Sequence, residues 1–201
     1  MGYYTRVLSK RSDAPTHEEL ERTLHAARPD VNLSIEEGAG ANWTELVLSH
    51  RDGPDIAAIE RNPVADGSLG AEEIAEFMEG VRDCRPATAV QWLVSYLPEV
   101  KTVYSFQHLS GTRERRGDEA LRLVSEAIWA RGQAILQADG EGFSNEDGYH
   151  ILWQFSDGVS GPWWMAVLKD DQWVRFQMEL GNREQREAFF DGRVPEGVKT
   201  A

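Results

Sequence analysis

The chain has 201 residues, of which 41% are hydrophobic and 9% aromatic, so it can build one large core or two small fused cores without disulfides. Its formal net charge of −13 argues against binding nucleic acid through phosphate contacts. The charge is compatible with a basic protein partner, and also with a surface that is acidic for solubility alone. The single cysteine, Cys84, excludes an internal disulfide and a cysteine-rich metal site.

We expect neither a secretion signal nor a membrane-spanning segment in this sequence. The first residues contain no apolar core of the length that a secretion signal needs, and no window approaches 18 apolar residues. We therefore expect a soluble cytoplasmic protein that does not bind membranes. No phosphate-binding loop, dinucleotide fingerprint or nucleophile elbow is present, so no cofactor is expected.

The first hundred residues alternate between strand and helix signals. Thr16 followed by Glu19 forms a capping box that opens a helix running to about Arg28. Apolar residues at helical spacing predict a second helix over 71–83 and a third over 86–97. Strands are expected at the β-rich or alternating segments 3–9, 31–37, 43–50 and 54–61, the last two joined by a hairpin at Arg51-Asp52-Gly53.

The second hundred residues also alternate between strand and helix signals. A strand is expected over 101–110, and a helix over 118–131 follows the basic loop Gly111–Gly117. That loop is a solvated turn or a contact for an anion or acidic partner. Further strands are expected at 134–139, 149–155, 163–168 and 173–180, and Lys169–Gln172 is expected to form a tight hairpin between the last two. Asn182 with Gln185 resembles a second capping box, which predicts a short helix there.

The two halves resemble one another. Tyr3–Ser9 aligns with Tyr104–Ser110 at an offset of 101, and Phe77–Gly80 aligns with Phe189–Gly192 at an offset of 112. An offset that drifts upward is what small loop insertions would produce. The pattern favours an α+β fold of two related β-α-β-β-β-α halves, 1–100 and 101–201, with a mainly antiparallel sheet and helix 86–97 as connector. The halves are expected to form one fused globular unit with a ligand cleft between the lobes.

The acidic loop 139–148 has two interpretations. Asp139, Glu141, Asn145 and Asp147 offer oxygen ligands at spacings that suggest calcium, but Ser144 stands where an EF-hand loop requires glycine. The simpler interpretation is a strand-to-strand loop in which the glycines permit positive φ and the Asn and Asp residues supply turn hydrogen bonds. Glu141 between two glycines is also a candidate binding residue, as is Asn145.

The histidines form no metal motif. His108 and His150 lie in expected strands of the second half, and with Asp139 and Glu141 they could form an acid/base pair. Histidines that are simply hydrogen-bonded within a sheet would produce the same pattern.

Two further features could belong to a binding surface. Trp163 and Trp164 are adjacent in an expected strand, so their side chains face opposite ways and one must leave the main core. Four glutamates cover much of the rest of the helix over 71–83, namely Glu72, Glu73, Glu76 and Glu79. They are typical of a solvated helix face, and a dock for a basic partner is the alternative.

Three hypotheses about function follow. The first is a non-catalytic module of inhibitor, immunity or regulatory type that binds a basic protein. The second is an enzyme or small-molecule binder that uses His108, Asp139, Glu141 and His150. The third is a calcium-stabilised module built on the loop 139–148.

Overall fold

The structure is a computed structural model that describes residues 2–200. It is an α+β fold with mainly antiparallel strands and, within the described residues, five α-helices, as the sequence predicts. The chain divides into two compact units, and each unit draws on both sequence halves. Unit 1 comprises Met1–Ala71 and Val100–Ala134, and unit 2 comprises Glu72–Glu99 and Ile135–Ala201.

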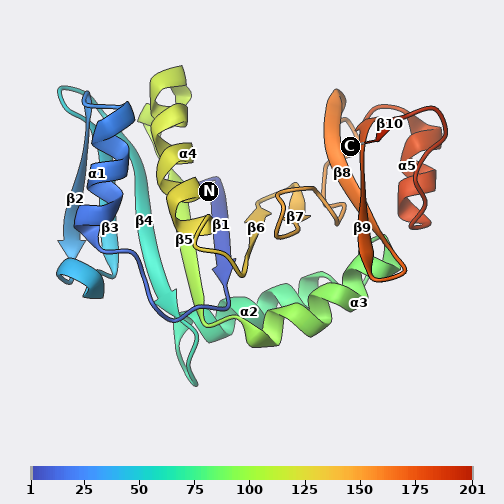
Figure 1. Ribbon diagram of the computed structural model, residues 1–201, viewed down its shortest axis with the longest axis horizontal. Helices are drawn as coiled ribbons and strands as arrows, with labels where there is room; N and C mark the ends of the chain where they lie inside the picture. The colour runs from blue at the N-terminus through green and yellow to red at the C-terminus, as the bar shows by residue number, and fades with distance from the viewer. Residues whose placement is uncertain (1, 201) are drawn as a thin grey trace. The chain divides into compact units, whose positions relative to one another are not determined.

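Unit 1 is an antiparallel sheet with two helices on one face (Figure 1). Its strands lie in the order β2-β3-β4-β5-β1. The strands are β1 (Tyr4–Ser9), β2 (Val31–Glu37), β3 (Glu45–His50), β4 (Asp55–Pro63) and β5 (Thr102–His108). The helices are α1 (His17–Ala27) and α4 (Arg115–Trp129), with 3₁₀ turns η1 (Gly40–Asn42) and η3 (Ser110–Arg113).

Helix α1 begins where the capping box predicts. The Thr16 hydroxyl accepts a hydrogen bond from the Glu19 amide at 3.1 Å, and the Glu19 carboxylate accepts one from the Thr16 amide at 2.8 Å. These two bonds satisfy donors that the first helical turn cannot pair internally. Leu20 and Leu24 then fall on the buried face, so local capping and burial agree on the position of the helix.

Unit 2 combines a three-stranded antiparallel sheet, ordered β10-β9-β8, with a short hairpin and three helices (Figure 1). The strands are β6 (Ala134–Ala138), β7 (Gly142–Ser144), β8 (Pro162–Lys169), β9 (Gln172–Glu179) and β10 (Lys199–Thr200). The helices are α2 (Leu69–Gly80), α3 (Ala87–Tyr96) and α5 (Arg183–Phe190), and a 3₁₀ turn, η2 (Leu97–Glu99), follows α3. Helix α2 and strand β6 both begin in the last residues of unit 1.

Strands β8 and β9 form the hairpin that the sequence predicts. Asp170 and Asp171 make its two-residue turn with φ of 50° and 59°, the left-handed conformation that such a turn requires. Phe176 and Met178 are buried on one face of β9, while Arg175 lies on the other. The buried face packs with Phe189 of α5 in the core of unit 2.

The strand expected over 149–155 is wrong. His150 pairs with β8 through Trp164 and Ala166, but Trp153 donates instead to the carbonyl of Arg85. The segment changes its hydrogen-bonding partner along its length and builds no continuous ladder. Its burial does not alternate either, because His150, Ile151 and Leu152 are all buried. Strand β7, within the loop expected over 139–148, was not predicted.

No α-helix within residues 2–200 combines the length and apolar character that crossing a bilayer requires.

Candidate functional site

Acidic charge is concentrated in unit 2. This unit contains 18 of the 34 acidic residues and 8 of the 21 basic residues, which leaves a formal charge of −10. Unit 1 contains 16 acidic and 13 basic residues, a formal charge of −3. The sequence order hides this contrast, because each unit is assembled from two separate segments. A basic partner would therefore be attracted mainly to unit 2.

The carboxylates of α2 form an exposed stripe on this unit. Glu72, Glu76 and Glu79 are spaced i, i+4, i+7, so they share one helix face, and all three are exposed. Within residues 2–200, none of the three forms an ion pair or a side-chain hydrogen bond. Ile74 is buried on the other side of the helix, which anchors α2 and leaves the acidic face to solvent.

Asn145 organises the loop 139–148 from inside. Its side chain is fully buried, and its amide oxygen accepts hydrogen bonds from the backbone of Asp147 at 3.1 Å and Tyr149 at 2.9 Å. The Asp147 carboxylate forms an ion pair with Arg175 at 2.7 Å. These contacts match the turn interpretation of the loop, because the oxygens of Asn145 and Asp147 are engaged by protein donors.

No group of three or more His, Cys, Asp or Glu side chains that could hold a metal ion occurs in the described part of the chain. The calcium hypothesis for Asp139, Glu141, Asn145 and Asp147 stays a prediction. It requires a cation to replace the contacts of Asn145 and Asp147.

His150 is a buried residue of unit 2. Its ring Nε2 lies 2.9 Å from the main-chain carbonyl of Glu141, which can only accept, so Nε2 carries the proton. The other ring nitrogen lies 3.4 Å from the Ser144 hydroxyl, and the ring packs on Phe155 at 4.8 Å. Burial lowers the pKa of His150 to about 4, although hydrogen bonds to the main-chain carbonyls of Glu141 and Leu152 partly oppose that shift.

The four predicted acid/base residues are divided between the units. His108 closes β5 in unit 1, whereas Asp139, Glu141 and His150 belong to unit 2. Within unit 2, His150 contacts the main chain of Glu141 through its ring. The acid/base hypothesis stays a prediction.

The tryptophan pair divides between two environments, as alternation predicts. Trp163 is 38% exposed and packs edge-on against Phe155 at 5.5 Å. Trp164 is half-buried, with the Tyr149 ring at 6.0 Å and the Lys199 ammonium 5.8 Å from its centroid. A binding role for either side chain stays a prediction.

His108 lines a pocket of about 600 Å³ in unit 1. The lining comes from three places in the sequence: the start of β1, the end of β5 and the turn η3. The lining residues are Gly2, Tyr3, His108, Leu109, Ser110, Thr112 and Arg113. The sequence marked His108 and the basic loop separately, but nothing in the sequence indicated that Tyr3 would join them.

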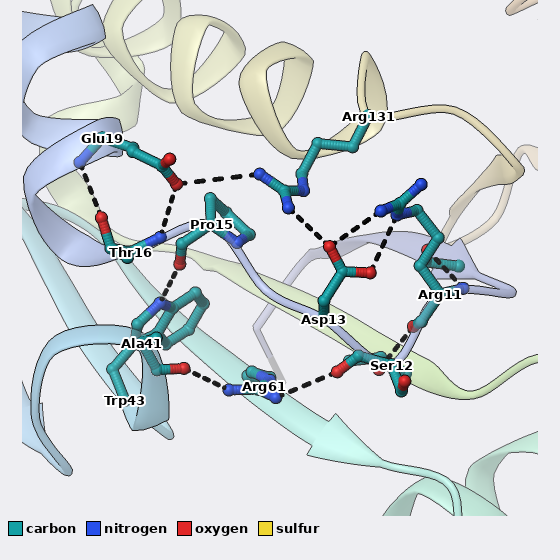
Figure 2. Close-up of polar contacts among 12 residues, drawn as sticks. Arg11, Ser12, Asp13, Pro15, Thr16, Glu19, Ala41, Trp43, Arg61 and Arg131 are labelled. Carbon is teal, nitrogen blue, oxygen red and sulfur yellow. Dashed lines mark hydrogen bonds and ion pairs between the residues drawn. The ribbon is translucent and has the colours of Figure 1, made fainter.

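A polar network joins the start of α1 to the end of α4. Figure 2 shows Asp13 between two guanidinium groups, with Arg11 at 2.8 Å and Arg131 at 2.6 Å. Arg131 also lies 3.7 Å from Glu19 of the capping box. The hydrogen bonds from Arg11 and then Arg131 hold the pKa of Asp13 well below its usual range. Because the two guanidinium groups balance the charge of the Asp13 carboxylate, we interpret this network as one that stabilises the fold.

Replacing Asp13 with Asn is expected to destabilise unit 1, because the two guanidinium groups would lose their shared anion. The low pKa of Asp13 means that wild type keeps this contribution until the pH falls below the ordinary carboxyl range. Urea unfolding of Asp13→Asn should show a lower midpoint than that of Asp66→Asn, an exposed carboxylate without an ion pair among the described residues. Equal urea midpoints for the two variants would contradict a stabilising role of Asp13.

No protein-family model, curated protein or solved structure matches the chain. Any functional proposal therefore rests on the residues and their geometry.

Proposed function

We propose that this protein is a non-catalytic binding module, of inhibitor or regulatory type, which docks a basic protein on the exposed face of α2. The observation that carries the proposal is the stripe of Glu72, Glu76 and Glu79, exposed and without ion pairs in the described structure. The stripe lies in the unit that holds most of the net negative charge. Long-range attraction would then steer a basic partner toward this face.

The later part of the stripe is costly to the helix that carries it, whereas Glu72 lies in the first turn of α2, where the helix dipole favours a negative charge. Like charges at i, i+4 and i, i+3 destabilise a helix by a few tenths of a kcal/mol for each pair. Glu79 also lies near the C-terminal end of α2, where the helix dipole disfavours negative charge, and the last turn contains no basic residue. A sequence that served only folding would gain from a lysine at one of these positions. A basic partner bound on this face would supply the missing positive charge and offset the repulsion between the glutamates.

Neutralising the stripe is expected to weaken the binding of the partner without lowering the stability of the fold. The triple variant Glu72→Gln, Glu76→Gln, Glu79→Gln should be as stable as wild type or slightly more stable, because it removes repulsion within α2. Affinity capture with the full chain, from cells that carry its gene, should recover a basic protein with wild type. The variant should recover at least tenfold less of that protein, and raising the salt concentration should weaken capture by wild type.

The matched control changes the same net charge elsewhere in unit 2. Asp157, Glu184 and Glu196 are exposed and, within the described residues, form no ion pair. Their replacement by Asn, Gln and Gln should leave capture unchanged. Capture that drops equally in both triple variants would show that only overall charge matters, and the docking face proposed on α2 would be wrong.

We also propose that the two sequence halves arose by duplication. Support comes from the aligned segments of the two halves and from unit 1, where β1 and β5, the first strand of each half, pair side by side and antiparallel. The helices that follow them, α1 and α4, pack together and are joined by an ion pair between Arg28 and Glu119 at 3.1 Å.

A further inference from the structure

The His108 pocket contains one side chain with a permanent charge. Of the described residues that line it, this is Arg113, and no carboxylate is among them. Arg113 is exposed and forms no ion pair or side-chain hydrogen bond within residues 2–200, whereas Arg115, two residues along, pairs with Glu119 at 3.0 Å. In a chain with 34 acidic residues, a pocket-lining guanidinium without a carboxylate partner favours an anionic ligand.

The pocket contains a second hydrogen-bond donor, the side chain of Ser110. The Ser110 hydroxyl is exposed and has no hydrogen-bond partner among the described residues. By contrast, the Thr112 hydroxyl donates to the carbonyl of Ile56 at 2.5 Å, so it is already engaged. Ser110 and Arg113 lie at the two ends of the turn η3, where an anionic group could accept from both.

The remaining wall of the pocket is aromatic and apolar. The amide of His108 donates to the carbonyl of Tyr3 at 3.0 Å, which holds the two side chains together where β5 ends and β1 begins. Their rings meet edge to face with centroids 4.8 Å apart, and Tyr3 remains 39% exposed. Leu109 completes this wall. Such a surface contacts a flat ring better than a hydrated ion alone.

We propose that this pocket binds a small aromatic acid, that is, an anionic group carried on a single ring. Arg113 and Ser110 receive the anion, while Tyr3, His108 and Leu109 contact the ring. A neighbouring pocket, around His50, does not have this character, because Asp30, Asp52 and Glu114 line it together with Arg51 and Arg116. The proposed ligand site lies in unit 1 and is independent of the docking face proposed on α2.

Titration of the isotopically labelled full chain with benzoate, followed by NMR, tests the proposal. We expect saturable shifts of the amide signals of Tyr3, His108 and residues 110–113. Arg113→Gln should weaken the binding of benzoate about tenfold, because it removes a charge-assisted contact. Arg115→Gln, which changes the same charge outside the pocket, should bind as wild type does.

Three further probes separate the parts of the proposal. Phenyl phosphate should bind at the same signals, since it presents an anion on the same ring. Inorganic phosphate that binds as tightly as phenyl phosphate would overturn the role of the aromatic wall. Benzyl alcohol that binds as tightly as benzoate would overturn the role of Arg113. Absence of saturable shifts with both aromatic anions would overturn the site itself, with folding checked on the same spectra.

Discussion

Acidification from pH 7 to pH 4 is expected to remove roughly 3 kcal/mol from the free energy of unfolding through His150 alone. The unfolded chain takes up a proton at this imidazole near pH 6.5, whereas burial in the folded state delays uptake to about pH 4. Between these values the unfolded state binds more protons, so stability falls as the pH falls. Above pH 6.5 both states hold the neutral ring and the effect vanishes.

Urea unfolding at a series of pH values, followed by tryptophan fluorescence, measures this effect. His150→Gln removes the titrating group and should flatten the curve between pH 6.5 and 4 relative to wild type. The variant is expected to be less stable than wild type at pH 7, since the ring packs on Phe155 and bonds to the carbonyl of Glu141. Parallel pH curves for the two proteins would show that another group is responsible.

Replacing Gly117 with Ala is expected to cost about 3 kcal/mol or more, because the space for a methyl group is already filled by backbone. An added Cβ would lie 2.0 Å from the carbonyl oxygen of Gly111 and 3.3 Å from the ring of His50. Gly117 lies in the first turn of α4, and Gly111 lies in η3. Their contact lets α4 start directly against the turn that carries Ser110 and Arg113.

A second glycine in a helix gives the matched control. Gly80, at the end of α2, has no atom within 4 Å of an added Cβ. Gly80→Ala should therefore leave stability unchanged or raise it by up to about 1 kcal/mol through helix propensity. Urea unfolding of both variants should give shifts of opposite sign or very different size. A Gly117→Ala variant as stable as Gly80→Ala would contradict the close approach of α4 and η3.

Local signals were sufficient for most of the secondary structure. The capping residues Thr16 and Asn182 both accept the expected hydrogen bonds, and the turn at Asp170 and Asp171 forms where the sequence predicts it. The strand predicted over 149–155 does not form, for a physical reason. The sequence pattern of the segment alternates as a strand would, but a strand also needs a continuous hydrogen-bonding partner, which the sequence does not reveal.

Burial and long-range contacts account for what the sequence could not show about the sites. The sequence indicates His150 as a candidate because it is titratable. Its burial, however, depends on Phe155 and Trp163, which contact it only in the folded chain. The charge of unit 2 was hidden because its segments lie apart in the sequence. The pocket of His108 needed the pairing of β1 with β5 to bring Tyr3 beside it.

Carbodiimide coupling is the most direct test of the proposed function, because it joins a carboxylate to a lysine only where the two are in contact. The full chain would be coupled to the basic protein that it captures, and the joined peptides identified by mass spectrometry. The docking proposal predicts that Glu72, Glu76 and Glu79 of α2 couple to lysines of the partner. Coupling confined to other carboxylates, such as the equally exposed Asp157, Glu184 and Glu196, would contradict it.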